Sequence, residues 1–351
     1  MHVVSARLWW PKAQIVFRSL CANPVFNASI LGPEGRVITN WERDFFRDVK
    51  PFGFIVFARN IDTPDQLRRL TSDLRDAAGH DAPILIDQEG GRVQRMRAPY
   101  WREWLPPLDQ AQQASDPARS FYLRSRIMAE ELRAVGIDAN CAPTCDIAGD
   151  QTHPFLRNRC LETAPESVIA NARATADGLL DGGVLPVMKH MPGHGRGTKD
   201  SHLDVPMTDV PKDIAQATDF APFRALNDMP MGMTAHIIFT AYGMIPSTQN
   251  PAVIDMIRRD IGFDGLLMTD DISMEALSGD VAIRTTASMA AGCDLVLHCN
   301  GEPAEMQAVA NAAGDMTPAA QVRATTALSR RKTPEPVDIA ALSAELNTLL
   351  G

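Results

Sequence analysis

Residues 53–87, GFIVFARNIDTPDQLRRLTSDLRDAAGHDAPILID, contain the unit that decides the fold. Two short apolar runs, Gly53–Phe57 and Pro83–Asp87, lack polar alternation, which is typical of parallel strands covered on both faces. Between them, Pro64–Ala78 carries leucines on one side at helical spacing, with Thr63 as the expected N-cap and a proline at the first helical position. The stretch therefore predicts one strand–helix–strand unit.

The same pattern recurs along the chain, where apolar runs bounded by turn residues alternate with helix-compatible segments. The expected strands are Phe26–Leu31, Gly53–Phe57, Pro83–Asp87, Ile137–Cys141, Val184–His190, Met231–Ile237, Gly265–Asp270 and Cys293–Cys299. Further helices are expected at Asp116–Val135 and Pro165–Leu180, and the tail Pro334–Gly351 should form a terminal helix on the outside. The series predicts an α/β fold of the (β/α)8 TIM-barrel type, as a single domain over residues 27–351 after an N-terminal extension of residues 1–26.

Charge and composition restrict the class of partner. The chain of 351 residues has a formal net charge of -9 and no cluster of Lys and Arg, which disfavours binding to nucleic acid or to an anionic membrane. It has no run of about 18 apolar residues that could span a bilayer, and residues 1–27 lack the apolar centre of a signal peptide. We therefore expect a monomeric cytoplasmic protein whose partner is a small molecule.

The cysteines predict neither disulfides nor a metal site. Six cysteines are too few for a disulfide scaffold in a chain of this length, and several lie in or beside apolar runs. Cys141 and Cys145 are four positions apart, which is not the usual spacing of a zinc or redox pair. We expect buried free thiols, no metal and no cofactor.

Polar residues end several of the expected strands. They are Asp87, Lys189, His190, His236, Asp270 and His298. Because a barrel of this type builds its active site from the C-terminal strand ends and the loops that follow them, these side chains are expected to converge on one rim.

The loop that follows the fifth expected strand reads KHMPGHGRGTKDSH over residues 189–202. Asp200 and His202 lie two positions apart, and a carboxylate beside an imidazole fixes its tautomer and makes it a proton donor and acceptor near neutral pH. Gly195 and Gly197 give the loop backbone freedom. We therefore expect the loop to close over bound substrate with these two glycines as hinges.

A second signal is the sequence LLMTDDISM at residues 266–274. Asp270 should project from its strand end into the site, where a carboxylate can attack an anomeric carbon if a separate acid protonates the leaving oxygen. Asp271 is expected instead to cap or support the helix that follows.

A third signal is the sequence IDQEGGRVQR at residues 86–95. Asp87 can accept hydrogen bonds from two hydroxyl groups. Glu89 and Arg92 are expected to pair with each other and so to shape the loop.

Together these motifs resemble the single-domain bacterial β-N-acetylglucosaminidases of glycoside hydrolase family 3. The resemblance covers the chain from about Asn27 to its end, and all three motifs stand in the family's order. Met191 replaces the usual phenylalanine of the loop motif, and the segment Arg157–Cys160 departs from the family's usual Gly-Glu-Arg-Ala.

The resemblance implies hydrolysis of terminal non-reducing N-acetylglucosamine from peptidoglycan fragments, with retention of configuration and without a cofactor, during cytoplasmic cell-wall recycling. Asp270 would be the nucleophile that forms a covalent glycosyl-enzyme, His202 the acid/base and Asp200 its partner. The sugar-binding residues implied by the resemblance are Asp87, Arg95, Arg159, Lys189 and His190.

Three other classes of protein remain open from the residues alone. Lys189 at a strand end could form the Schiff base of an aldolase. His190, His194 and His202 could hold zinc in a metallohydrolase. A barrel that binds sugar without hydrolysing it is the non-enzymatic alternative, although Asp270 and His202 both argue for catalysis.

Overall fold

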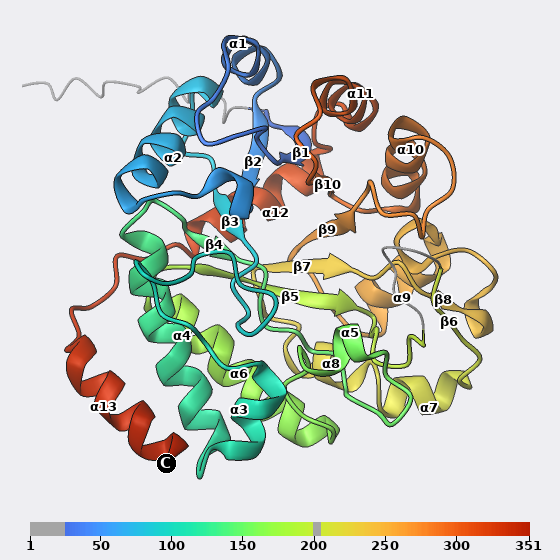
Figure 1. The fold of residues 1–351 in the computed structure, drawn as a ribbon. Coiled ribbons are helices and arrows are strands. Elements are labelled where there is room, and N and C mark those ends of the chain that lie inside the picture. Colours follow the sequence, from blue (N-terminus) through green and yellow to red (C-terminus); the bar gives the residue numbers. More distant parts are fainter. Residues whose placement is uncertain (1–24, 199–204) are drawn as a thin grey trace, which may run out of the picture.

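The computed structural model of the chain describes residues 25–198 and 205–351. Within these ranges eight parallel strands close into a barrel in the order β1-β10-β9-β7-β5-β4-β3-β2. They are β1 (Asn27–Leu31), β2 (Pro51–Val56), β3 (Ile84–Ile86), β4 (Ala139–Asn140), β5 (Leu185–Met191), β7 (Met231–Thr234), β9 (Leu266–Asp271) and β10 (Leu295–His298). Helices surround the strands (Figure 1). The predicted single-domain (β/α)8 barrel is confirmed, whereas the N-terminal extension stays a prediction because residues 1–24 lie outside the described ranges.

Each of the eight expected runs overlaps one barrel strand, but the fourth strand is much shorter than predicted. β4 has two residues, and the side chain of the second, Asn140, also takes part in the pairing. Asn140 Oδ1 accepts from the backbone N–H of Gln88 at 3.0 Å, and its Nδ2 donates to the Gln88 carbonyl at 3.0 Å. An amide side chain thus continues the pairing with the chain after β3.

The helices are α1 (Asn40–Val49), α2 (Pro64–Ala78), α3 (Pro107–Gln113), α4 (Pro117–Arg133), α5 (Pro154–Arg157), α6 (Pro165–Asp181), α7 (Lys212–Ala217), α8 (Ala221–Ala225), α9 (Pro251–Arg259), α10 (Val281–Ala291), α11 (Pro303–Ala313), α12 (Pro318–Ser329) and α13 (Ile339–Leu350). Three predicted helices, α2, α4 and α6, begin and end within two residues of the predicted positions, whereas α13 begins five residues later than the predicted tail. Thr63 caps α2 as expected by accepting from the N–H of Gln66. Gly79 ends that helix with a left-handed φ of 72°, a conformation that glycine adopts without steric cost.

The C-terminal helix α13 packs on the outside of the barrel against α4, as the tail of the sequence predicted. Arg119 on α4 donates to both carboxylate oxygens of Glu345 on α13, at 2.7 and 3.0 Å. The backbone N–H of Ser115 also donates to the carbonyl of Leu349 at 2.9 Å.

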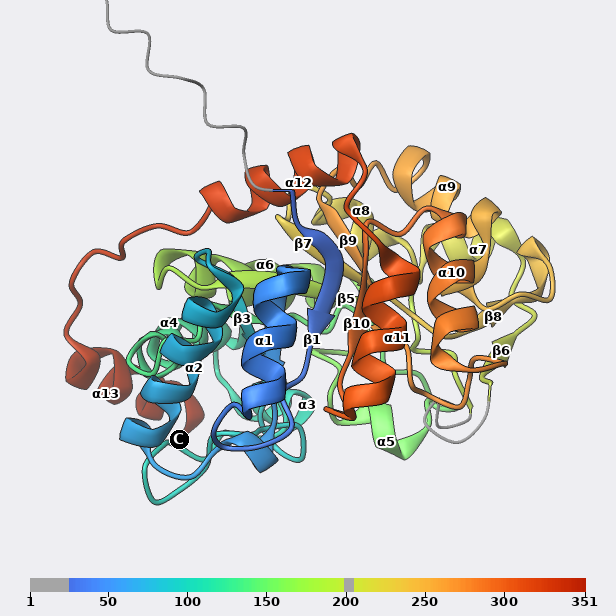
Figure 2. The ribbon, with the colours of Figure 1, turned by 90° about the horizontal axis from the view of Figure 1, so that it is seen from above.

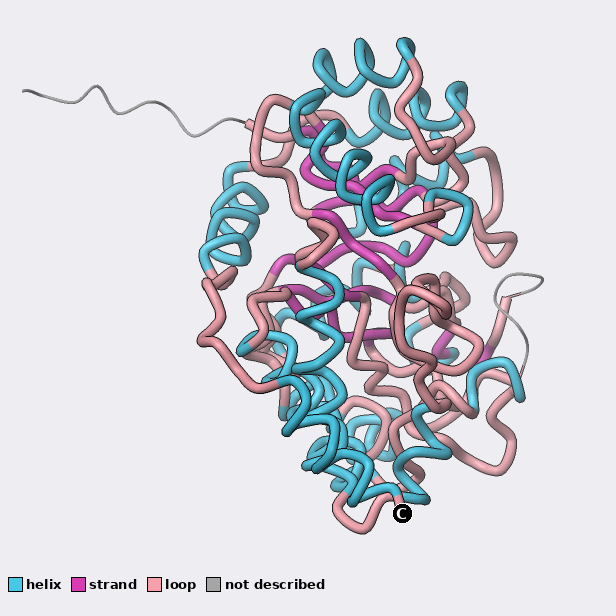
Figure 3. Tube along the Cα trace, turned by 60° about the vertical axis from the view of Figure 1, so that its left-hand side comes forward, coloured by secondary structure: helices cyan, strands magenta, loops and turns pink. Residues whose placement is uncertain are grey.

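The interior of the barrel is filled with apolar side chains, so that the barrel is a packed core and not a pore. Those with almost no exposed surface include Ile30, Phe52, Leu85, Val187, Met231 and Met268. Helix α12 lies across the end at which β1 begins (Figure 2), and its Ala320, Ala324 and Ala327 pack against this core. Figure 3 shows the strands enclosed by helices. A site therefore has room at the other end, where the strands finish.

Outside the barrel, β6 (Met207–Thr208) pairs with β8 (Ile238–Phe239) in a small second sheet that the sequence did not predict. The cysteines of the described ranges are free thiols, and all but Cys299 are buried, as expected; Cys21 lies outside these ranges. No helix in the described part of the chain combines the length and apolar character needed to cross a membrane.

Candidate active site

A cavity opens at the C-terminal end of the barrel strands. Its lining includes all the described residues that were predicted to bind or attack the sugar, namely Asp87, Arg95, Arg159, Lys189, His190 and Asp270. Apolar side chains, among them Phe57, Phe155 and Met233, complete the lining. The convergence of strand-end polar residues on one rim is thus found for Asp87, Lys189, His190 and Asp270, and Arg95 and Arg159 join them from loops.

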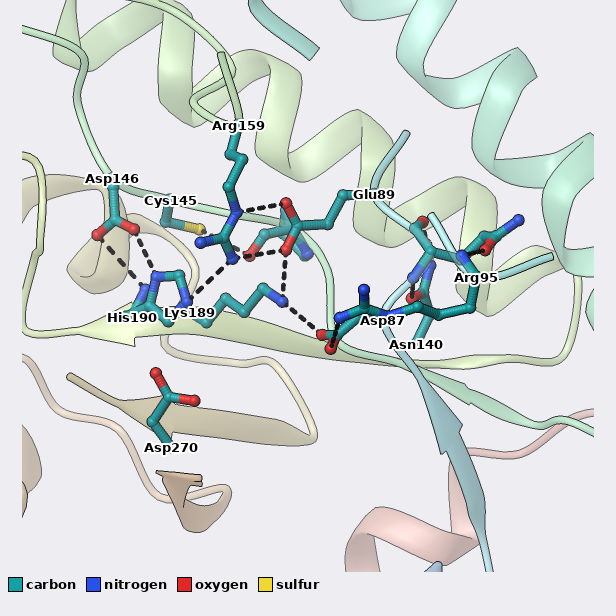
Figure 4. A network of polar contacts seen from close by, with 12 residues as sticks. Asp87, Glu89, Arg95, Asn140, Cys145, Asp146, Arg159, Lys189, His190 and Asp270 are labelled. Carbon is teal, nitrogen blue, oxygen red and sulfur yellow. Dashed lines mark hydrogen bonds and ion pairs between the residues drawn. The ribbon is translucent and has the colours of Figure 1, made fainter. Parts of the chain in front are cut away.

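Acidic and basic side chains alternate along one wall of this cavity (Figure 4). Lys189 Nζ lies 2.9 Å from Asp87 Oδ1 and 2.6 Å from Glu89 Oε1. Arg159 donates to Glu89 from Nε at 2.9 Å and from Nη2 at 2.8 Å. Arg95 Nη2 donates to the second oxygen of Asp87 at 3.1 Å. Two carboxylates and three cations therefore form one continuous ion-pair chain.

Mutual attraction keeps these buried groups charged. Burial alone would raise the pKa of Asp87 and of Glu89, but the neighbouring cations outweigh it. Lys189 and Arg95 hold the pKa of Asp87 well below its usual range, and Arg159 with Lys189 lowers the pKa of Glu89 to about 2. Burial would likewise lower the pKa of Lys189, yet Asp87 and Glu89 raise it above its ordinary value. The wall is thus a fixed array of hydrogen-bond donors and acceptors at neutral pH.

His190 is held from behind by Asp146, a residue that sequence reasoning missed. Asp146 Oδ2 lies 2.7 Å from His190 Nδ1, and Asp146 Oδ1 accepts from the backbone N–H of His194 at 2.6 Å. The opposite nitrogen, His190 Nε2, lies 3.4 Å from Arg159 Nη2. His190 therefore joins the ion-pair wall to a buried carboxylate.

Asp270 stands apart from this network at the end of β9, as Figure 4 shows. Its Oδ1 accepts from the backbone N–H of Asp271 at 2.8 Å, and among the described residues its carboxylate takes no other hydrogen bond. Burial would raise the pKa of Asp270, but attraction to His190 and His236 and this backbone hydrogen bond lower it. The carboxylate is thus ionised and faces the cavity with one oxygen uncommitted.

The expected pairing of Glu89 with Arg92 and the expected capping role of Asp271 were wrong. Glu89 does not pair with Arg92 to shape its own loop but pairs with Arg159 and Lys189, and the Arg92 guanidinium lies 3.7 Å from the centre of the Phe155 ring. Asp271 does not cap the following helix, which has Asp280 as its N-cap. Instead Asp271 accepts hydrogen bonds from the N–H and the hydroxyl of Ser273, and so shapes the turn after β9.

Two strand-end histidines do not reach the cavity lining. His236 is fully buried between Thr248 Oγ1 at 2.7 Å and the carbonyl of Asp271 at 2.9 Å. His298 is also buried, with its Nε2 2.9 Å from Glu305 Oε2. Their expected place on the cavity rim is therefore wrong.

The predicted acid/base pair, Asp200 and His202, lies outside the described residues. The two glycines that precede it lie where close packing excludes a side chain. An added Cβ at Gly195 would lie 2.0 Å from the carbonyl oxygen of Ile147, and at Gly197 it would lie 2.8 Å from His194 Nδ1. These contacts explain why glycine stands at both positions, and the hinge role of the two residues stays a prediction.

The geometry of the site argues against a Schiff-base aldolase and a zinc metallohydrolase. Lys189 is protonated and held between two carboxylates, which makes it a poor nucleophile for a Schiff base. Nδ1 of His190 faces a carboxylate, and the described ranges contain no group of His, Cys, Asp or Glu that could hold a metal ion. The wall suits a polyhydroxylated neutral ligand, because it offers paired donors and acceptors.

Comparisons with known proteins show the family to which the chain belongs. Residues 40–328 match the glycosyl hydrolase family 3 N terminal domain. The β-hexosaminidase of Alkalilimnicola ehrlichii is 35% identical over 302 residues, which cover 84% of this chain and 86% of that protein. The β-hexosaminidase of Methylococcus capsulatus is 37% identical over 267 residues, which cover 74% and 78%.

Solved structures show the same likeness. NagZ from Neisseria gonorrhoeae, in complex with N-trifluoroacetyl-D-glucosamine, superposes with a TM-score of 0.82 at 28% identity and covers 93% of this chain and 97% of that one. A family 3 β-N-acetylglucosaminidase from Paenibacillus superposes with a TM-score of 0.80 at 26% identity, covering 91% of this chain and 66% of that one. The fold and the family match define the class of protein as a glycoside hydrolase. The chain belongs to glycosyl hydrolase family 3 and is a β-hexosaminidase similar to NagZ.

Proposed function

We propose that this β-hexosaminidase is a retaining exo-β-N-acetylglucosaminidase with Asp270 as its nucleophile. The observation that carries the proposal is the environment of Asp270. Its ionised carboxylate faces the same cavity as Lys189 and His190, with one oxygen free of protein hydrogen bonds among the described residues. A carboxylate in this state can attack a carbon without first giving up a proton or a hydrogen bond.

The reaction then takes two steps. In the first, a carboxylate oxygen of Asp270 forms a bond to the anomeric carbon of the sugar, while the bond to the leaving oxygen breaks and His202 transfers its proton to that oxygen. In the second, His202 takes a proton from water, whose oxygen displaces Asp270 and releases the free sugar. Asp200 beside His202 supports the positive imidazolium of the resting enzyme.

The ion-pair wall would bind the hydroxyl groups of the sugar. Asp87 can accept from two hydroxyls, whereas Lys189, Arg95 and Arg159 can donate to sugar oxygens. Because each cation is matched by a buried carboxylate or lies beside one, the wall favours a neutral sugar over a charged one. His190 Nε2, at the edge of the cavity, supplies one further polar contact.

We infer that the sugar is a terminal N-acetylglucosamine and that the natural substrate is a peptidoglycan fragment. The sugar is supported by the ligand of the Neisseria structure and by the activity in the name of the Paenibacillus enzyme. The peptidoglycan role rests on the resemblance of the three sequence motifs, and the cytoplasmic location and the monomeric state stay predictions from the sequence.

Trapping of the covalent intermediate tests the proposal. Incubation with 5-fluoro-N-acetylglucosaminyl fluoride, followed by proteolysis and peptide mass mapping, should add the mass of the fluorosugar to the peptide that contains Asp270. The Asp270→Asn variant is the matched control and should take up no label. A label on another residue of active wild-type enzyme would overturn the assignment of the nucleophile.

A further inference from the structure

The ring of His190 has a fixed orientation, because each of its nitrogens faces a partner of different character. Nδ1 lies 2.7 Å from Asp146 Oδ2, and Nε2 lies 3.4 Å from Arg159 Nη2. A guanidinium nitrogen can only donate a hydrogen bond, whereas an ionised carboxylate can only accept one. The two partners therefore select between the two tautomers of the ring.

Asp146 itself is ionised and enclosed. Its side chain has 0% exposed surface, so no bulk water can share its charge. Burial would raise its pKa, but His190 and the backbone N–H of His194 lower it instead. With a carboxylate on this side, the hydrogen of the imidazole must sit on Nδ1.

The carboxylate of Asp146 has two separate duties. Oδ2 accepts from Nδ1 of His190, while Oδ1 accepts from two backbone N–H groups, that of His194 at 2.6 Å and that of His190 at 3.4 Å. The main chain that carries Asp146 is held beside β5, because the N–H of Cys145 donates to the carbonyl of Lys189 at 2.6 Å. One side chain thus ties the sugar-binding histidine to the backbone of the loop that leads toward Asp200 and His202.

We propose that Asp146 is a positioning residue of the glycosidase reaction, which keeps the hydrogen of His190 on Nδ1 so that Nε2 presents a lone pair to Arg159 and the sugar. The inference rests on the proposed function of the site and deepens it. Nε2 of His190 can accept a hydrogen bond from a sugar hydroxyl only in this tautomer. In the other tautomer Nε2 carries the hydrogen and turns a donor toward both the guanidinium and the hydroxyl.

The variant Asp146→Asn separates this role from simple packing. Asparagine has nearly the same shape but only one acceptor oxygen, and its amide nitrogen donates. If the amide oxygen of the asparagine accepts from the N–H of His194, the amide NH2 group faces Nδ1 of His190. Nδ1 must then accept a hydrogen bond, so the ring hydrogen moves to Nε2. The amide oxygen is expected on the side of Oδ1, because two backbone N–H groups donate there, those of His194 and His190, and a flipped amide would turn a donor toward both.

Asp294→Asn is the matched control. Asp294 is also a buried carboxylate that accepts from a backbone N–H, that of Leu267 at 2.9 Å, and from the guanidinium of Arg258 at 2.6 Å. It precedes β10 and lies at the opposite end of the barrel strand from the cavity. Its replacement should destabilise the fold without altering His190.

The experiment reads the tautomer and the activity separately. Long-range ¹H–¹⁵N spectra of ¹⁵N-histidine-labelled protein should show His190 with hydrogen on Nδ1 in wild type and in Asp294→Asn, and with hydrogen moved to Nε2 in Asp146→Asn. A His190→Gln sample assigns the signal.

With 4-nitrophenyl N-acetyl-β-D-glucosaminide, kcat/KM of Asp146→Asn should fall by about tenfold to a hundredfold, as expected when a buried polar group loses its partner. Asp294→Asn should stay within about twofold of wild type.

Several outcomes would overturn the inference. One is a wild-type spectrum with the hydrogen of His190 on Nε2, which decides the question even if Asp146→Asn fails to fold. Another is an unchanged kcat/KM in a folded Asp146→Asn protein whose tautomer has inverted. Absence of glycosidase activity in wild type would instead count against the proposed function, because the spectrum reports the tautomer without any substrate.

Discussion

Arg159 holds Glu89 through two parallel hydrogen bonds, Nε to Oε2 at 2.9 Å and Nη2 to Oε1 at 2.8 Å. The two residues are 70 positions apart in the chain and both are buried. Planar groups that meet in this way fix each other's orientation as well as their distance. The pair therefore sets the direction of the Arg159 guanidinium, which in turn faces His190 and the cavity.

The substitution Glu89→Gln should damage both stability and activity. The amide nitrogen that replaces one carboxylate oxygen would face Arg159 or Lys189, which both donate, so that a buried cation is left without its counter-charge. We expect the free energy of unfolding to fall by about 3 to 5 kcal/mol, and kcat/KM to fall by at least about tenfold. Urea denaturation at pH 7 and aryl glycoside kinetics measure the two effects.

A surface ion pair provides the comparison for Glu89. Arg119 and Glu345 make a similar two-bond contact between α4 and α13, but each side chain is 42% exposed. Glu345→Gln should therefore lower the free energy of unfolding far less than Glu89→Gln does, because solvent screens an exposed ion pair. Equal losses in the Glu89 and Glu345 variants would contradict the view that burial makes the first pair strong.

Asp270→Asn should abolish turnover and leave the fold intact. The amide oxygen can still accept from the backbone N–H of Asp271, but the amide is a far weaker nucleophile than the carboxylate. We expect the barrier to rise by about 5 kcal/mol or more, which corresponds to a loss of roughly three to four orders of magnitude in kcat. A variant that folds like wild type and keeps most of its rate would remove Asp270 from the mechanism.

His202→Ala should distinguish between substrates by their leaving groups. A nitrophenyl leaving group departs without much protonation, whereas the leaving oxygen of a disaccharide needs a proton from the acid. The loss of kcat/KM should therefore be at least about tenfold greater for the disaccharide. Comparable losses on both substrates would argue that His202 is not the acid.

The sequence predicted those parts of the site in which a polar residue directly follows an apolar run. Asp87, Lys189 and Asp270 belong to this class, because the end of a buried strand fixes where the next side chain lies. The same pattern misplaced His236 and His298, since a strand end does not reveal whether a side chain faces the cavity or the surrounding helices.

Other parts of the site depend on contacts that no local pattern encodes. Asp146 lies in irregular chain after β4, six positions beyond the end of that strand, and becomes important only because that chain runs beside β5. Glu89 was expected to pair with Arg92, three positions away, but its partner comes from the segment after α5. Pairings across the barrel mouth become visible only once the barrel is closed.

His194 predicts how stability depends on pH. Burial lowers the pKa of His194 to about 4; Asp146 opposes this shift, and neighbouring His190 contributes to it. Between this value and the ordinary pKa of about 6.5, the unfolded chain binds a proton that the folded protein does not bind, so stability must fall as the pH falls through this window. The contribution of this one group between pH 7 and pH 5 is about 2 kcal/mol.

The variant His194→Gln isolates that contribution from the other titrating groups, which are common to both proteins. When urea denaturation is repeated at pH 5 instead of pH 7, wild type should lose about 2 kcal/mol more of its unfolding free energy than His194→Gln loses. Removing the histidine thus makes the protein less sensitive to acid even if it is less stable at neutral pH. Parallel pH profiles of the two proteins would mean that His194 is not buried in its neutral form.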